Sequence, residues 1–104
     1  MSGESGLKKH HLDEIREILD RHPEVEKAII FGSRAKGTYR KASDIDIAIF
    51  GKRITLSTLL SLMSDFEESH LPYFVDVVDY KKVDKKLREE IDQFGKLIYI
   101  RKVK

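Results

Sequence analysis

Two aspartates, Asp44 and Asp46, are separated by one isoleucine in a stretch where polar and apolar residues alternate. Successive side chains of a β-strand point to opposite faces, so the two carboxylates would share one face, about 6–7 Å apart. Carboxylate oxygens on a rigid strand suit Mg²⁺, which keeps several waters and takes further oxygens from a phosphate. A pair of solvated acids on an edge strand is the alternative interpretation of this motif alone.

A Gly-Ser pair ends the apolar segment before these aspartates, and residues 34–43 lie between the two motifs. Glycine lets backbone amides approach a phosphate without a Cβ in the way, and the hydroxyl of Ser33 adds a donor. The intervening segment has no acid and four bases, Arg34, Lys36, Arg40 and Lys41. Arg34 and Lys36 are therefore candidates for phosphate contacts, although ordinary loop bases explain them equally well.

The spacing of Gly32-Ser33 and Asp44-x-Asp46 resembles the signature of the polymerase-β-type nucleotidyltransferase superfamily. Residues 31–49 are similar to its minimal (MNT) branch, and the resemblance extends from about Leu12 to Ile100. It implies the nucleotidyltransferase fold, with residues 8–104 as one minimal nucleotidyltransferase domain. Residues 1–7 are small and polar up to Leu7, and we expect them to be a disordered N-terminus.

The resemblance also implies a third carboxylate on a later strand, for which Asp76 and Asp79 are candidates. Three residues apart on a regular strand, they point to opposite faces and cannot both serve. Asp76 lies between two valines as Asp46 lies between two isoleucines, so we select it and interpret Asp79 as a strand-end residue or a polar contact. The expected catalytic and metal-binding residues are Asp44, Asp46 and Asp76. The expected nucleotide- and phosphate-binding residues are Gly32, Ser33, Arg34 and Lys36.

The function implied by the resemblance is transfer of AMP from ATP, with two Mg²⁺ ions, to a hydroxyl of a partner protein. MNT proteins commonly act as antitoxins that attach AMP to a HEPN-domain ribonuclease toxin. A chain of 104 residues holds a catalytic lobe and little else, so we expect a partner to carry the acceptor. Two alternatives stay open: a nucleotide-binding clamp that neutralises its partner by binding, and an RNA 3′-end nucleotidyltransferase.

Composition limits the class of protein. The chain has no cysteine, which excludes a disulfide scaffold and a thiolate zinc site. Charged residues make up 37% of it. No apolar run approaches the ~20 residues of a membrane helix, so we expect a cytoplasmic protein without a membrane partner. The net charge of +2, from 20 basic and 18 acidic residues, is too balanced to indicate a nucleic-acid binder.

Hydrophobic periodicity predicts the elements that must position the acids. Helices are expected over residues 8–22, 56–66 and 84–94, with Asp84 as a cap and Gly95 as a stop; strands are expected over 25–31, 44–50, 73–80 and 97–100. Only residues 32–43 separate the first two strands, which favours an antiparallel pair. The predicted class is α/β (α+β), a small mixed or antiparallel sheet with helices packed on it.

Apolar residues at helical spacing predict which helix faces are buried. In the second helix we expect Leu56, Leu59, Leu60, Met63 and Phe66 to be core rather than a groove for a partner. In the last helix we expect Leu87, Ile91 and Phe94 to face inward. His10, His11 and His70 are expected to be solvated.

Overall fold

The computed structural model describes residues 6–40 and 43–102. Its elements are α1 (Lys9–Asp20), β1 (Lys27–Phe31), α2 (Ser33–Lys36), β2 (Ile45–Phe50), α3 (Leu56–Glu67), β3 (Val75–Asp79), η2 (Tyr80–Lys82), α4 (Lys85–Phe94) and β4 (Lys96–Ile100). Apart from the short turns α2 and η2, this is the predicted order of helices and strands.

The four strands form one mixed sheet in the order β3-β2-β1-β4. Strand β1 is antiparallel to both β2 and β4, whereas β2 and β3 are parallel and joined through α3. A parallel pair needs a crossover connection, which α3 supplies. The mixed sheet predicted from the sequence is therefore confirmed, with β2 inside it and β3 at one edge.

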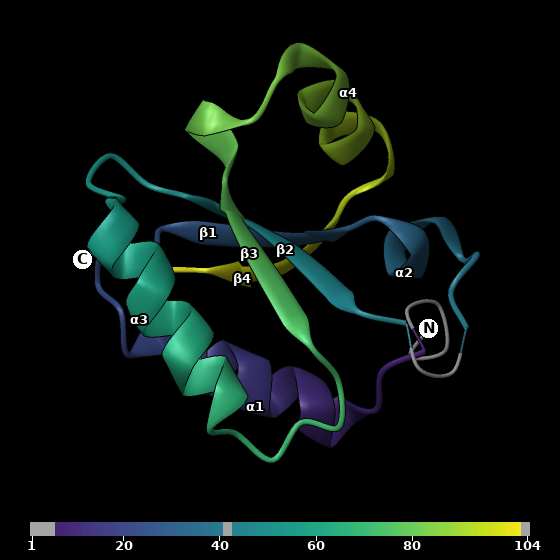
Figure 1. The fold of residues 1–104 in the computed structure, drawn as a ribbon, viewed down its shortest axis with the longest axis horizontal. Coiled ribbons are helices and arrows are strands. Elements are labelled where there is room, and N and C mark those ends of the chain that lie inside the picture. The colour runs from purple at the N-terminus through teal and green to yellow at the C-terminus, as the bar shows by residue number, and fades with distance from the viewer. Residues whose placement is uncertain (1–5, 41–42, 103–104) are drawn as a thin grey trace.

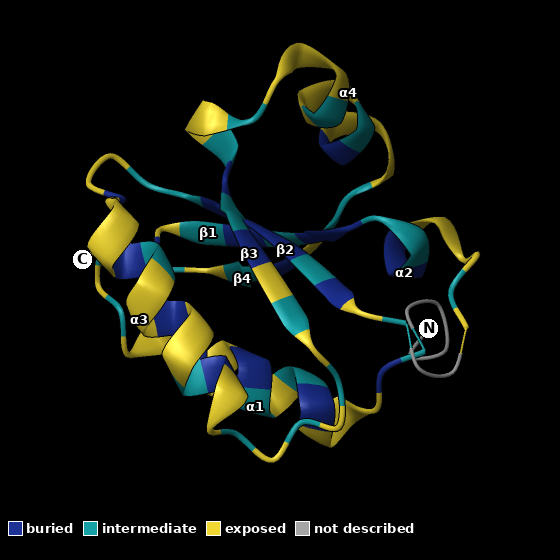
Figure 2. Cartoon of the chain, in the orientation of Figure 1, coloured by how far each residue is buried: buried dark blue, intermediate teal, exposed yellow. Residues whose placement is uncertain are grey.

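The two faces of the sheet are covered differently (Figure 1). Helices α1 and α3 lie against one face and α4 lies over the other. Ile45, Ile47 and Ile49 of β2 point toward α1 and α3 and are completely buried in the main core. On the other face a smaller cluster joins Ala48 to Ile91 of α4. Buried residues accordingly concentrate in β1, β2 and the inner sides of the helices (Figure 2).

Side chains cap two of the helices at their N-termini. The Asp84 carboxylate accepts a hydrogen bond from the Leu87 N–H at 2.8 Å, which confirms the predicted cap of α4. The Thr55 hydroxyl accepts from the Thr58 N–H at 3.2 Å and begins α3 in the same way. Gly95 follows α4 directly, and a Cβ at this position would collide with the Ile91 carbonyl oxygen.

The predicted core face of α3 is wrong in part. Leu62 and Phe66 are buried and Leu59 packs against the core, but Leu56, Leu60 and Met63 are exposed. The buried line follows positions 59, 62 and 66, and the exposed residues lie on the neighbouring side of the same helix. The apolar residues of this sequence therefore cover two helix faces, of which the sheet needs only one.

Three smaller expectations also differ from the structure. Leu7 is 2% exposed and packs in the main core, so disorder does not extend over all of 1–7; residues 1–5 lie outside the described residues. His11 is buried, with its ring edge-on to Tyr73 at 5.4 Å, while His10 and His70 are exposed as predicted. Phe94 is exposed at the end of α4, where we expected it to face inward.

The longest helices in the described segments, α1 and α3, have 12 residues each and fall short of crossing a bilayer.

Candidate active site

Asp46 and Asp76 are neighbours across the parallel pair of strands. The register of β2 and β3 places the Cα of Asp46 opposite that of Asp76. Residues paired in this way project their side chains on the same face of a sheet, here the face that α4 covers only in part. Asp44 precedes β2 by one residue and is exposed. The strands thus bring two of the three predicted acids side by side and carry the third at the entrance of β2.

Gly32 lies directly against Asp46. Its backbone has φ 77° and ψ −153°, a conformation that side-chain-bearing residues rarely adopt. A Cβ at position 32 would collide with the Asp46 carboxylate. Ser33 then begins α2, whose first turn is closed by hydrogen bonds from the Ala35 and Lys36 N–H groups to the Gly32 carbonyl. The glycine is needed for close approach, and the group it approaches is an acid of the site.

Negative charge gathers around Asp46. The pKa of Asp46 is raised to about 6, chiefly by burial and then by the nearby carboxylates of Asp76, Asp44 and Glu90, in that order of effect. A bound cation or a phosphate-chelated metal would reverse these effects. The raised pKa is the physical sign that this group of acids suits a positive ligand.

Lys36 is the last residue of α2, and its side chain reaches α4 at the border of the site. Its Nζ is 3.2 Å from a carboxylate oxygen of Glu90 and 5.4 Å from the centre of the Phe94 ring. Glu90 in turn is close enough to affect the charge state of Asp46. The predicted phosphate-binding lysine is therefore near the acids, where it also joins α2 to α4.

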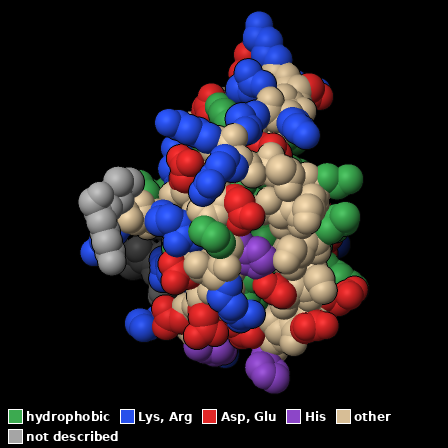
Figure 3. Space-filling model, turned by 90° about the vertical axis from the view of Figure 1, so that its left-hand side faces the viewer, with side chains coloured by type: hydrophobic (Ala, Val, Ile, Leu, Met, Phe, Trp, Pro, Cys, Tyr) green, Lys and Arg blue, Asp and Glu red, His purple; other side chains and the backbone are tan. Residues whose placement is uncertain are grey.

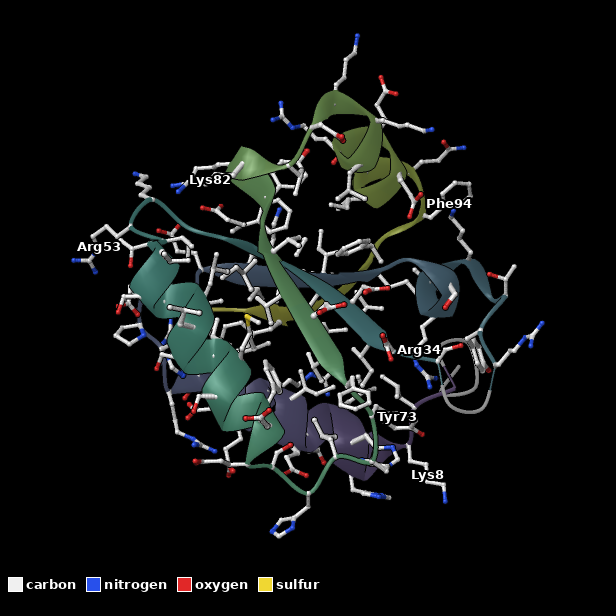
Figure 4. The ribbon with its side chains drawn as sticks, viewed as in Figure 1. Lys8, Arg34, Arg53, Tyr73, Lys82 and Phe94 are labelled. Atoms are coloured by element: carbon white, nitrogen blue, oxygen red, sulfur yellow. The ribbon has the colours of Figure 1, made fainter. Side chains whose placement is uncertain are left out.

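Arg34 takes a different position from the one we expected. It is 1% exposed, and its Nε and Nη2 donate to the Ser43 carbonyl at 3.1 and 2.9 Å. Its guanidinium lies 4.5 Å from the centre of the Tyr73 ring and 5.1 Å from that of Tyr39; Arg34 and Tyr73 lie close together in Figure 4. So placed, the guanidinium faces the interior. It fixes the backbone immediately before Asp44.

Asp79 lies on the opposite face from Asp76, as strand alternation predicts. It pairs with Ile49 on the side of α1 and α3 and is 3% exposed. Its Oδ1 accepts a hydrogen bond from the Lys81 N–H at 3.1 Å, which begins η2. Its Oδ2 is buried with no hydrogen-bond partner in the described part of the chain. Asp79 is a strand-end residue, away from the other acids.

The acids fit a magnesium–nucleotide complex better than a closed metal centre. Within residues 6–40 and 43–102, no three His, Asp or Glu side chains are gathered into a ready metal cluster. Mg²⁺ is commonly held by only one or two carboxylates, with water and substrate phosphates completing its coordination. Asp46 and Asp76 supply such a pair, and the charge excess at Asp46 favours a cation there.

Known proteins are similar to this chain in sequence and in fold. The family described as "Polymerase beta, Nucleotidyltransferase" matches residues 13–104. A protein of Haemophilus influenzae named "Probable protein adenylyltransferase MntA" is 33% identical over 86 residues, which cover 82% of this chain and 75% of that protein.

Solved structures agree with these matches. A chain from a crystal structure of a toxin–antitoxin complex with AMP-PNP aligns with a TM-score of 0.74 and 26% identity, over 86% of this chain and 73% of the other. A chain from the complex of a tri-AMPylated Shewanella oneidensis HEPN toxin with an MNT antitoxin aligns with a TM-score of 0.71 over 91% and 74%. Its identity of 22% makes that second likeness one of fold.

Proposed function

The chain belongs to the polymerase β nucleotidyltransferase family, and from this premise we propose that it is a protein adenylyltransferase that moves AMP from ATP to a hydroxyl of a partner protein. The pairing of Asp46 with Asp76 on one face of the sheet, with Asp46 against Gly32, is the observation that carries the proposal. The name of the 33% identical relative supports protein as the acceptor. The use of ATP and Mg²⁺ in this proposal supports a cytoplasmic location.

In the proposed reaction the acceptor oxygen attacks the α-phosphorus of ATP. A phosphorus–oxygen bond to the acceptor forms while the bond from the α-phosphorus to the bridging oxygen breaks, and pyrophosphate leaves. Asp44, Asp46 and Asp76 would hold two Mg²⁺ ions, which when bound neutralise charge on the attacking and leaving oxygens. Asp76 is the more exposed of the paired acids. Its carboxylate receives the proton of the acceptor hydroxyl and then releases it to water.

Phosphate binding in this proposal involves α2 and the turn before it. The Ser33 hydroxyl and the backbone N–H groups near Gly32 donate to phosphate oxygens, and Lys36 exchanges Glu90 for the triphosphate. Arg34 acts one step away, by holding the Ser43 carbonyl and thus the approach to Asp44.

The partner we propose is a HEPN-domain toxin, because chains of similar fold and sequence occur in toxin–antitoxin complexes. AMP attached to a toxin hydroxyl adds bulk and negative charge. Both effects oppose RNA binding by a ribonuclease, so this chain would serve as the antitoxin.

The test is to incubate the purified chain with the HEPN-domain toxin proposed as its partner, ATP and Mg²⁺, and to weigh both proteins by intact-mass spectrometry. The partner is expected to gain the mass of one or more AMP groups. Asp46→Asn and Asp76→Ala should abolish the gain. Asp79→Asn is the matched control, since it keeps the acceptor for Lys81 and lies on the other face.

Two results would replace the proposal. An unmodified partner together with a lengthened RNA 3′ end would show an RNA nucleotidyltransferase. Tight binding of the partner with neither acceptor labelled would show a clamp.

A further inference from the structure

The outward side of α3 carries a stripe of apolar residues. Leu56, Leu60 and Met63 are 66%, 56% and 41% exposed, although each is a large hydrophobic residue. Their spacing places them on one side of the helix, next to the side that meets the sheet. Much of the outward side of α3 is exposed in Figure 2, and hydrophobic side chains project at the right-hand edge of Figure 3, where α3 lies. A contiguous apolar stripe of this kind marks a contact with another protein.

Small side chains border the stripe. Ser57, Ser61 and Ser64 each follow one of the three apolar residues in the sequence, and all three are exposed. The distance between packed helices is set by the side chains at the contact, and small ones permit a close approach. A second helix can therefore lie flat along α3 and contact the whole stripe.

The two ends of the stripe carry opposite charges. Arg53 precedes α3 and points outward at its N-terminal end (Figure 4), whereas Glu67 is the last residue of α3, one turn beyond Met63. The two residues lie the same number of positions before and after Leu60. Both are exposed, and in the part of the chain that the structure describes neither has an ion-pair partner. The stripe is therefore complementary in charge to its own reversed copy.

We propose that this chain forms a dimer in which α3 packs antiparallel against α3 of a second copy, about a twofold axis at Leu60. A twofold interface uses the same surface on both copies. Leu60 meets Leu60 of the second copy, and Arg53 of each copy faces Glu67 of the other. The charges select this occupant and its direction, because a parallel copy would place like charges together at both ends.

A groove at one end of the stripe receives part of the second copy. This groove, of about 530 Å³, lies between the C-terminal half of α3 and residues 71–76, and Met63 lines it from the helix. Phe74, on its other wall, is 83% exposed. In the antiparallel arrangement Leu56 of the second copy arrives opposite Met63, so its side chain enters the groove. The dimer thus covers the most exposed large hydrophobic residues of this side of the molecule.

The dimer leaves the candidate active site open. Helix α3 covers one face of the sheet, whereas Asp46 and Asp76 lie on the face of α4. Each copy therefore keeps its acids on the side away from the interface. The inference does not rest on the proposed transfer of AMP, and self-association can be measured without nucleotide.

The first experiment measures the dimer Kd by sedimentation velocity over a range of chain concentrations. Leu60→Glu should raise this Kd about a hundredfold, because it removes two leucines from the axis and sets two carboxylates against each other there. Leu97→Glu is the matched control, since Leu97 is also 56% exposed but lies in β4, at the other edge of the sheet. It should leave the Kd unchanged.

The second experiment exchanges the charges. Arg53→Glu and Glu67→Arg should each raise the Kd about tenfold, since like charges then meet at both ends of the interface. An equimolar mixture of the two variants should associate with the Kd of the unaltered chain, because each supplies the charge that the other needs. Lys86→Glu, at an exposed position of α4, makes the same change in net charge as Arg53→Glu and should have no effect.

Several results would overturn the dimer. Among them are an unaltered chain that stays monomeric at about 0.5 mM, equal effects of Leu60→Glu and Leu97→Glu, and a mixture that associates no better than its components. If Leu60→Glu weakened binding of the HEPN-domain toxin but not self-association, the stripe would belong to that partner. The mixing experiment alters only exposed charges, so it decides the arrangement even if Leu60→Glu fails to fold.

Discussion

Asp46 is the residue at which folding and the proposed chemistry make opposite demands. Its carboxylate is half-buried against Gly32 and faces other acids, so the pKa rises from 3.8 to about 6 in the folded chain. A raised pKa means that the folded state binds the proton more tightly than the unfolded state does. Stability therefore falls as pH rises from about 4 to 6 and stays low above that range.

The variant Asp46→Asn should stabilise the metal-free protein while abolishing transfer. At pH 7.5 with EDTA, we expect an increase on the order of 1 kcal/mol after allowance for solvent screening, which is several degrees in Tm. The increase should vanish well below pH 4, where Asp46 is protonated in both states. Thermal unfolding followed by circular dichroism measures it, with the exposed Glu89→Gln as control. A lower Tm for Asp46→Asn at pH 7.5 would contradict the account.

Arg34 marks the limit of what spacing shows about a side chain. A base one residue after Gly32-Ser33 suits a phosphate, yet its guanidinium is buried against Tyr73. That contact joins positions about forty residues apart, and no local pattern predicts it. Tyr73 and Glu90 were missed for the same reason, since each reaches the site through tertiary packing.

At the scale of elements, alternation was the reliable signal. The isoleucines of β2 fixed which face carries Asp46, and the valines of β3 did so for Asp76, because both strands repeat every two residues. Helix α3 could not be predicted so well, since its leucines fit more than one face at helical spacing. Which face is buried depends on how the helix meets the sheet.

Arg34 links α2 to the approach of β2, and its replacement tests that link. Arg34→Lys keeps the charge but loses the forked pair of hydrogen bonds to the Ser43 carbonyl, so we expect a loss of about 2 kcal/mol in stability. The transfer rate should fall at least tenfold because Asp44 loses its support. Urea denaturation and initial rates measure the two effects. The exposed Arg40→Lys should change neither, and an equal loss in both variants would refute a positioning role for Arg34.

For the whole molecule, the sheet separates stability from function. One face is closed by α1 and α3, whereas the other leaves the acids open beside α4. Charge is also separated: Figure 3 shows Lys and Arg side chains gathered in the upper part of that view, over η2 and α4. The groove between α3 and residues 71–76, in contrast, has Glu67 and Asp76 as its charged lining residues within the part of the chain that the structure describes.

Binding of Mg²⁺–ATP should stabilise the molecule as a whole, because the folded state alone assembles the acids. At a free Mg²⁺–ATP concentration one hundred times Kd, the free energy of unfolding rises by about 2.7 kcal/mol. We expect a matching rise in Tm by differential scanning fluorimetry, which EDTA removes and AMP does not reproduce. Asp46→Asn should lose the response. A rise of the same size in that variant would mean that the nucleotide binds elsewhere.

The alternation within β2 sets how this strand can change during evolution. Single substitutions act on one face at a time, so the core and the acids can each vary separately. Deletion of one residue between Ile45 and Ile49 would turn part of the strand over, bringing isoleucines to water and an aspartate into the core. Deletion of two residues would restore the faces but move Asp46 away from Asp76. A substitution on one face of the strand can thus leave the other face in place, whereas a change in the length of the strand cannot.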